Sequence, residues 1–403
     1  MKPAVMLCLA PLVCALLSGC AEETVEPLPL IAEKDYSAPL PPGQVALRRI
    51  TDPARIPDFS HAFAMRAGLT EAVDRSLNYL SKPSSQDHFP YGPGGAITHQ
   101  RVVRSLGAFR ETLAAAGSGA ELNALLRQRF EVWESVGCDG QGSVLFTGYY
   151  CPIFDARLAP DERFRYPLHR VPDDLVKDSE GRCLGRRRPD GSIEPGYPDR
   201  RKLLSGRLLS GSELCYLRDP FEAYIVTVQG SAKLRLADGS FHEIGYAANN
   251  GHSYLSVGRL LVEDGKIPAD ELSLARMIRF FREYPNEVRF YTSRNPRYVF
   301  FKEARGGPYG SLNERVTPYR TIATDKEVYP RACLAFIQTR LPAHEGGRIV
   351  QHAYHGFALD QDTGGAIRAA GRCDLFLGTG DEVGELAGRT LSEGRLYYLF
   401  AKP

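Results

Sequence analysis

Two aspartates near the C-terminus lie in surroundings that suit proton transfer. Asp374 is flanked by a cysteine on one side and by leucine and phenylalanine on the other. Such an apolar setting disfavours the charged carboxylate and raises its pKa, so the group can donate a proton near neutral pH. Asp362 precedes a glycine pair, and a turn there would bring its carboxylate towards Asp374. The two carboxyls could then share a proton, or Asp362 could simply cap the turn.

Short strands are expected to hold these aspartates. From Tyr298 onwards, short apolar runs alternate with glycine-rich turns, which is typical of a small closed barrel. These runs cover residues 299–301, 334–337, 354–359, 375–377 and 397–400.

The N-terminal part of the chain is predicted to be helical. Val102, Leu106, Phe109 and Leu113 recur at helical spacing, and a second helix is expected over 121–134. Further on, strands are predicted at 144–150, 224–228 and 234–236, with a turn at 238–239. Helical periodicity returns over 256–262 and 272–281.

The composition is that of an ordinary globular protein. The 403 residues are 43% hydrophobic and 24% charged, with a formal net charge of +2. This length is enough for two domains, and the charge implies no strong polyanion partner. No nucleic-acid motif is present, and we interpret the three consecutive arginines at 186–188 as a solvated loop.

Residues 1–19 have the pattern of a lipoprotein signal peptide. Lys2 precedes an apolar run over 4–17, and the segment 17–20 (LSGC) resembles a bacterial lipobox ending at Cys20. A plain secretory signal is the alternative. Lipid on Cys20 would add about 0.8 kcal/mol of membrane binding per buried methylene. Because alanine rather than aspartate follows Cys20, lipoprotein sorting favours the outer membrane, facing the periplasm. Residues 20–45, rich in Glu and Pro, are expected to form a tether.

The six cysteines after Cys20 leave two possibilities open. No CxxC spacing occurs, so we expect no zinc site, and no other metal or cofactor is indicated. An oxidising compartment permits disulfides, for which proximity favours Cys183 with Cys215 and Cys138 with Cys151. Buried free thiols are the alternative.

Five segments, in order, carry a more specific signal. They are 146–152 (FTGYYCP), 166–175 (YPLHRVPDDL), 228–231 (VQGS), 250–258 (NGHSYLSVG) and 362–378 (DTGGAIRAAGRCDLFLG). Together they resemble the membrane-bound lytic murein transglycosylase A (MltA) family, over about residues 142–402. The C-terminal part also resembles the three-aspartate (3D) domain, with its aspartates at Asp325, Asp362 and Asp374.

The resemblance implies a mainly β fold with N-terminal helices. A double-psi β-barrel would carry the aspartates, and a second, smaller β-domain would be inserted into it, leaving a substrate groove between the two. We place the first part of the barrel domain at 46–155, the insert at 156–300 and the rest of the barrel at 301–403.

The activity implied is cleavage of the β-1,4 bond between N-acetylmuramic acid and N-acetylglucosamine in peptidoglycan, with 1,6-anhydromuramic ends. Most glycosidases need two carboxylates. A lytic transglycosylase needs only one, because the sugar's own 6-hydroxyl attacks and is already present at high effective concentration. The resemblance assigns the acid/base to Asp374, with Asp362 and Asp325 as supports, although a structural role remains open for Asp325.

Sugar binding requires flat apolar faces and fixed polar groups. Thr147, Gln229 and Ser231 could bond to sugar hydroxyls, or serve only as loop and hairpin caps. Tyr149 and Tyr150 could stack on sugar rings, but strand alternation sends them to opposite sides, so at most one faces the groove. Gly230 would allow a glycan to approach the backbone. For His252 we favour a structural hydrogen bond over a catalytic role.

Two rival functions stay open. A hydrolase on the same scaffold would need Asp362 to activate water, at about 6.5–9.5 Å from Asp374. A peptidoglycan-binding lipoprotein would need the groove but no raised pKa. A cysteine nucleophile is set aside, because no histidine is placed to activate Cys373. The expected partners are glycan strands, the outer membrane through the lipid and wall-synthesis proteins.

Overall fold

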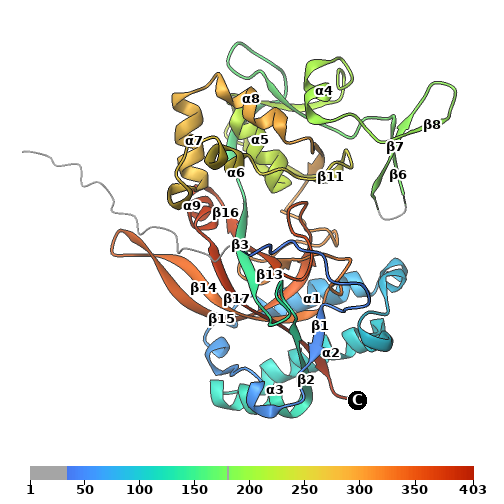
Figure 1. The fold of residues 1–403 in the computed structure, drawn as a ribbon, viewed down its shortest axis with the longest axis vertical. Coiled ribbons are helices and arrows are strands. Elements are labelled where there is room, and N and C mark those ends of the chain that lie inside the picture. Colours follow the sequence, from blue (N-terminus) through green and yellow to red (C-terminus); the bar gives the residue numbers. More distant parts are fainter. Residues whose placement is uncertain (1–33, 179–180) are drawn as a thin grey trace, which may run out of the picture.

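A closed β-barrel forms the lower half of the molecule (Figure 1). The computed structural model describes residues 34–178 and 181–403, so the expected signal peptide and Cys20 lie outside the described residues. Six strands follow one another round the barrel, and the pairing of the last strand with the first closes it. In order these strands are β17 (Leu391–Ala401), β14 (Leu334–Glu345), β15 (Arg348–Asp362), β13 (Thr321–Ala323), β16 (Arg372–Thr379) and β3 (Val144–Cys151).

Two short strands and four helices complete this half. The strands β1 (Leu47–Arg49) and β2 (Phe130–Ser135) extend the sheet beyond β17. The helices are α1 (Leu69–Leu80), α2 (His99–Ala115), α3 (Gly119–Arg129) and α9 (Asp381–Gly388). The first two pack on β15 and β17, and α9 packs on β3 and β16. The core contains a cluster of fully buried aromatic rings, including Phe59, Phe336 and Phe357.

An inserted half lies above the barrel and is entered through β3 (Figure 1). Its six-stranded sheet has the order β12 (Val299–Ala304), β11 (Phe241–Asn249), β10 (Ser231–Arg235), β4 (Ile153–Arg157), β9 (Glu213–Leu217) and β5 (Tyr166–His169). A three-stranded sheet is formed by β6 (Leu175–Lys177), β7 (Cys183–Arg187) and β8 (Ile193–Pro195). The helices are α4 (Arg200–Ser205), α5 (Pro220–Gln229), α6 (Val257–Glu263), α7 (Leu274–Glu283) and α8 (Glu287–Arg294).

The barrel strands and the helices α2, α6 and α7 confirm the sequence pattern, but the strand expected over 224–228 is wrong. This segment is the C-terminal part of α5. Asp219 caps the helix by accepting hydrogen bonds from two backbone amides, and Pro220 occupies its first turn. Gly230 ends it in the left-handed conformation, at φ 80°. These caps, together with burial of one helix face, outweigh the strand preference of a β-branched run.

The second helix also ends earlier than expected. The helix α3 stops at Arg129, and the chain continues directly as strand β2, whose backbone pairs with β17. The tether predicted over residues 20–45 also ends earlier than expected. Tyr36 is already buried, and its hydroxyl donates to Glu393 of the barrel at 2.6 Å. Within the described residues, the chain therefore packs on the barrel from about Lys34.

The two disulfides favoured by proximity are absent from the described residues, where the six cysteines are free thiols. The strand β3 separates Cys138 from Cys151, and a strand rises by about 3.3 Å per residue. Cys183 lies in the small sheet, whereas Cys215 is buried in the larger one. No helix among the described residues is long and apolar enough to cross a membrane.

Candidate active site

The register of the barrel places two aspartates on either side of one residue. Strand β13 runs between β15 and β16, and Ala323 pairs with Asp362 on one side and Asp374 on the other. On the far side of β16, Asp374 pairs with Thr147 of β3. Cys373 is fully buried in the barrel core, so alternation directs the Asp374 side chain outwards.

The Asp374 carboxyl is poised to hold a proton. Its pKa is raised to about 6, chiefly by burial and in smaller part by the nearby Asp362 carboxylate, while Arg372 and Thr147 act in the opposite direction. Its Oδ1 atom is buried and has no hydrogen-bond partner among the described residues. A carboxylate that is ionised without a partner for one oxygen is unfavourable, which is the physical basis of the shift.

Arg372 lies on the same face of β16, two residues before Asp374. Its Nη2 donates to the hydroxyl of Thr147 at 3.3 Å, and its Nε is buried without a partner among the described residues. Burial lowers the pKa of this guanidinium, with Asp374 acting against the change. Sequence reasoning missed Arg372, although the two-residue period of a strand could have indicated it.

Asp362 is held in place by three hydrogen bonds. Its Oδ2 accepts from the Tyr149 hydroxyl at 2.8 Å, and its Oδ1 accepts from the backbone amides of Ser311 and Thr363, each at 2.8 Å. Burial nevertheless raises the pKa of this carboxyl, against the effect of those donors. The turn-capping role and the proximity to Asp374 expected from the sequence therefore occur together.

The Asp325 carboxyl bonds to the backbone of a barrel loop. Its two oxygens accept from the backbone amides of Glu327 at 3.1 Å and Ala369 at 2.8 Å. Ala369 adopts a left-handed conformation with φ 61°. The Asp325 carboxylate thus fixes the loop that leads from β15 into β16, which brings Asp374 into position.

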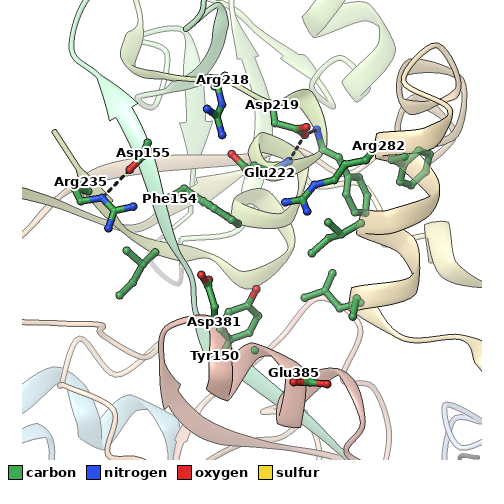
Figure 2. Close-up of a pocket in the computed structure, with 17 residues that line it drawn as sticks. Tyr150, Phe154, Asp155, Arg218, Asp219, Glu222, Arg235, Arg282, Asp381 and Glu385 are labelled. Carbon is green, nitrogen blue, oxygen red and sulfur yellow. Dashed lines mark hydrogen bonds and ion pairs between the residues drawn. The ribbon is translucent and has the colours of Figure 1, made fainter. Parts of the chain in front are cut away.

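The tyrosine pair divides between two faces of β3. Tyr149 reaches Asp362, whereas Tyr150 is only 4% exposed and packs against Gly384 of α9. Tyr150 also lines a cavity of about 290 Å³, which lies between α9 and the inserted half (Figure 2). Asp362 and Asp374 do not line this cavity, so it lies apart from the candidate site.

The residues at the C-terminal end of α5 and just after it differ in burial and contacts. Gln229 accepts a hydrogen bond from the Tyr150 amide at 3.2 Å, and Ser231 is buried at the start of β10. Gly230 has open space where a side chain would stand. His252 contacts the carbonyl of Tyr197 at 2.7 Å, the structural bond favoured from the sequence.

Two residues of the inserted half, Tyr254 and Arg297, lie close to the strand and loop that carry Asp374 and Asp362. Tyr254 lies close enough to Arg372 to interact with its charge. Arg297 packs on Gly365, since a Cβ built there would lie 2.6 Å from its Nε. The aspartates therefore lie near the junction of the two halves. Among residues 34–178 and 181–403, no cluster of three or more carboxylate, histidine or cysteine side chains could hold a metal ion.

Sequence reasoning also missed a buried polar network around Asp360, because its residues are scattered in the sequence. Asp360 is fully buried and accepts hydrogen bonds from Thr324 at 2.7 Å and Tyr398 at 2.6 Å, and it forms an ion pair with Lys326. All these groups are buried, so this network stabilises the barrel interior rather than contacting a ligand.

Fold and site together define a barrel-and-insert protein with a proton-holding carboxyl near the junction of its two halves. The family described as "MltA specific insert domain" matches residues 145–302, and the "3D domain" family matches 320–400. The chain belongs to the MltA family.

Individual relatives agree. Membrane-bound lytic murein transglycosylase A of Escherichia coli is 29% identical over 300 residues, covering 73% of this chain and 75% of that protein. The protein of the same name from Vibrio cholerae is 30% identical over 268 residues, covering 65% and 67%.

Solved structures show the same architecture. The membrane-bound lytic murein transglycosylase from Agrobacterium tumefaciens superposes with a TM-score of 0.72 at 26% identity, covering 88% of this chain and 98% of that one. E. coli MltA with bound chitohexaose has a TM-score of 0.66 at 23% identity, covering 92% and 97%, and supports the fold alone.

Proposed function

We propose that this protein is a lytic murein transglycosylase, which cleaves the β-1,4 bond between N-acetylmuramic acid and N-acetylglucosamine. Relatives that cover about three quarters of the chain carry that activity in their names. The observation that carries the mechanism is the outward-facing Asp374 carboxyl, with a pKa raised to about 6 and one oxygen without a partner.

In the first step Asp374 acts as general acid. It transfers its proton to the glycosidic oxygen as the bond to the anomeric carbon breaks, and positive charge develops on the sugar ring. Proton transfer by a positioned side chain typically accelerates a reaction by about 10²- to 10⁴-fold. The Asp362 carboxylate favours the protonated form of Asp374 before this step.

In the second step the Asp374 carboxylate acts as base. It accepts the proton of the 6-hydroxyl as that oxygen bonds to the anomeric carbon of the same sugar. The product is a 1,6-anhydromuramic end, and Asp374 is protonated again. No water is consumed, and the intramolecular nucleophile benefits from its high effective concentration.

The hydrolase alternative receives less support from the geometry. Asp362 would have to take a proton from water, but its oxygens already accept three hydrogen bonds, two of them from backbone amides. We therefore assign Asp362, with Tyr149, to the orientation and electrostatics of the site.

Substrate contacts are proposed at Thr147 and at the segment 229–231. Thr147 lies beside Asp374 in the register, and its side chain is partly exposed. The open space at Gly230 allows a sugar to approach the backbone there. Tyr150 is left out of this set, because its ring is buried on the opposite face of β3.

Mass spectrometry of the products from purified peptidoglycan tests the function. We expect anhydromuropeptides from the wild type and none from Asp374→Asn. The matched control is Asp270→Asn, which changes an exposed aspartate of the insert and should leave the products unchanged. Reducing ends from the wild type would establish a hydrolase. Retention on the wall without any product would favour the binding lipoprotein.

We also propose attachment to the outer membrane through lipid on Cys20, on the periplasmic side. Cys20→Ala should then release the protein from the membrane fraction and abolish incorporation of labelled palmitate. Unchanged fractionation would refute the anchor. Recruitment by wall-synthesis proteins stays a prediction.

A further inference from the structure

We propose that Arg372, with Thr147, forms a carboxylate-binding subsite beside Asp374 that selects glycan with an acidic muramic acid substituent over neutral glycan. This inference rests on the function proposed above and adds the substrate feature that the site recognises. The shared chemistry is a carboxylate, either the free lactyl group of a glycan without peptide or a carboxylate of the peptide stem.

Among the described residues the guanidinium of Arg372 has no carboxylate of its own, since the acidic group that acts on its charge is Asp374, the proposed acid itself. No ion pair joins it to an acidic residue within the described part of the chain, although its side chain is half-buried. Among the described residues its single side-chain hydrogen bond is the long one to Thr147, at 3.3 Å, and its buried Nε atom has no partner there. Buried guanidinium groups are normally paired, because removing their charge from water is unfavourable.

The Arg372 side chain lies on the same face of the barrel as Asp374. Cys373 between them faces the barrel core, so Arg372 and Asp374 share the outer face of β16. Thr147 on the neighbouring strand β3 is close to both residues, since it is the register partner of Asp374 and accepts a hydrogen bond from Arg372. A ligand that reaches the Asp374 carboxyl therefore comes within range of the guanidinium.

Two further arginines, Arg297 and Arg368, lie close to this part of the barrel. Arg297 packs on Gly365, and Arg368 is close enough to Arg297 to affect its pKa. Only Asp325, at 3.7 Å from Arg368, forms an ion pair with any of these three arginines among the described residues. The segment 365–372 itself contains Arg368 and Arg372 and no acidic residue, and Arg368 is paired with Asp325, so Arg372 is the positive charge of this segment that an anionic ligand can reach.

The guanidinium of Arg372 matches a carboxylate in both geometry and charge. A guanidinium presents paired N–H donors in a planar fork that matches the two oxygens of a carboxylate, which an ammonium group cannot reproduce. A bound carboxylate would also neutralise the charge that lowers the Asp374 pKa. Binding of the acidic substrate would therefore help Asp374 to keep its proton until cleavage.

The experiment compares three glycans of the same backbone, using the full chain. The first is denuded glycan with free lactyl carboxylates, the second is the same glycan with these groups converted to methylamides, and the third carries peptide stems. Binding and kcat/KM are measured for the wild type, Arg372→Gln and Arg372→Lys. The control is Arg259→Gln, which changes an exposed arginine on α6 of the inserted half.

We expect Arg372→Gln to weaken binding of a carboxylate-bearing glycan by about 10- to 100-fold and of the methylamide by less than about threefold. Arg372→Lys should be intermediate, and Arg259→Gln unchanged. A loss on denuded glycan identifies the lactyl group, and a loss only on stem-bearing glycan identifies the peptide. Equal losses on all three glycans would overturn the proposal and leave Arg372 as a structural residue.

A second readout separates binding from tuning of the acid. In the wild type, the alkaline limb of kcat should lie at higher pH with the carboxylate glycan than with the methylamide, and Arg372→Gln should abolish the difference. Identical limbs in the wild type would count against the subsite. If no anhydro ends form at all, the proposed function fails, while the binding comparison still decides whether the subsite exists.

Discussion

Replacing Asp374 by asparagine should make the protein more stable at neutral and alkaline pH while abolishing its activity. In the folded protein the pKa of Asp374 is raised from the ordinary 3.8 to about 6, chiefly by burial. A carboxyl with a raised pKa stabilises the folded state only while it is protonated. That contribution is complete below about pH 3.8 and is lost as the pH rises through about 6.

The size of the effect follows from the interval between the two pKa values. At 1.36 kcal/mol for each pH unit, the shift from 3.8 to about 6 corresponds to about 3 kcal/mol at pH 8. At about pH 5 the effect on the free energy of unfolding is only roughly half of this, because Asp374 is still mostly protonated in the folded form. Asparagine has the shape of the protonated acid and cannot ionise, so the variant avoids the whole effect.

The assay is urea unfolding followed by tryptophan fluorescence, near pH 5 and near pH 8. The chain has one tryptophan, Trp133, which is buried in β2 and so reports on the barrel. The free energy of unfolding of Asp374→Asn should exceed that of the wild type by more at pH 8 than at pH 5. Asp270→Asn should show no such pH-dependent gain. An equal gain at both pH values, or destabilisation at pH 8, would refute the assignment of a raised pKa to Asp374.

Three further substitutions test the supports of the site and the barrel. Tyr149→Phe removes a donor to the buried Asp362 carboxyl, so unfolding in urea should become easier by about 1.5–3 kcal/mol and kcat on purified glycan should fall; unchanged values for both would contradict that support. Asp325→Ala leaves two backbone amides without their acceptor and should lower stability by about 1–3 kcal/mol in thermal unfolding, whereas a loss of activity at full stability would point to a catalytic role. Lys326→Met leaves the buried Asp360 carboxylate without its ion-pair partner and should lower the free energy of unfolding by about 3–5 kcal/mol. A second change, Asp360→Asn, should restore much of that stability. A double variant as unstable as Lys326→Met alone would show that the pair is not coupled.

Much of the catalytic half could be predicted because its signals are local. Short apolar runs separated by glycines gave the barrel strands, and the segment 362–378 placed two aspartates in a recognisable order. The closure of the barrel through β17 and β3 was expected only through the resemblance to the family, because no local pattern specifies which strands pair.

The predictions that proved wrong failed because contacts distant in the sequence, or competing local signals, decided the structure. In α5 the cap at Asp219 and the glycine at 230 decided the conformation against β-branched residues that favour strands. In 130–135 the periodic apolar residues continued past the end of α3, and pairing with β17 converted them to a strand. The disulfides failed because nearness in sequence does not bring cysteines together when an eight-residue strand lies between them.

The value of about 6 for the Asp374 pKa reflects two opposing influences, burial of the carboxyl and the charge of Arg372 on the same strand. Burial alone would hold the proton so firmly that the carboxyl could donate it only slowly and, once ionised, would reclaim any available proton. Arg372, two residues earlier and on the same face, opposes burial most strongly. The chemistry proposed here needs both directions of transfer, first from Asp374 to the leaving oxygen and then from the 6-hydroxyl to Asp374. A pKa close to the working pH serves both steps, and an arginine whose charge can be neutralised by the substrate allows the balance to shift at the moment of binding.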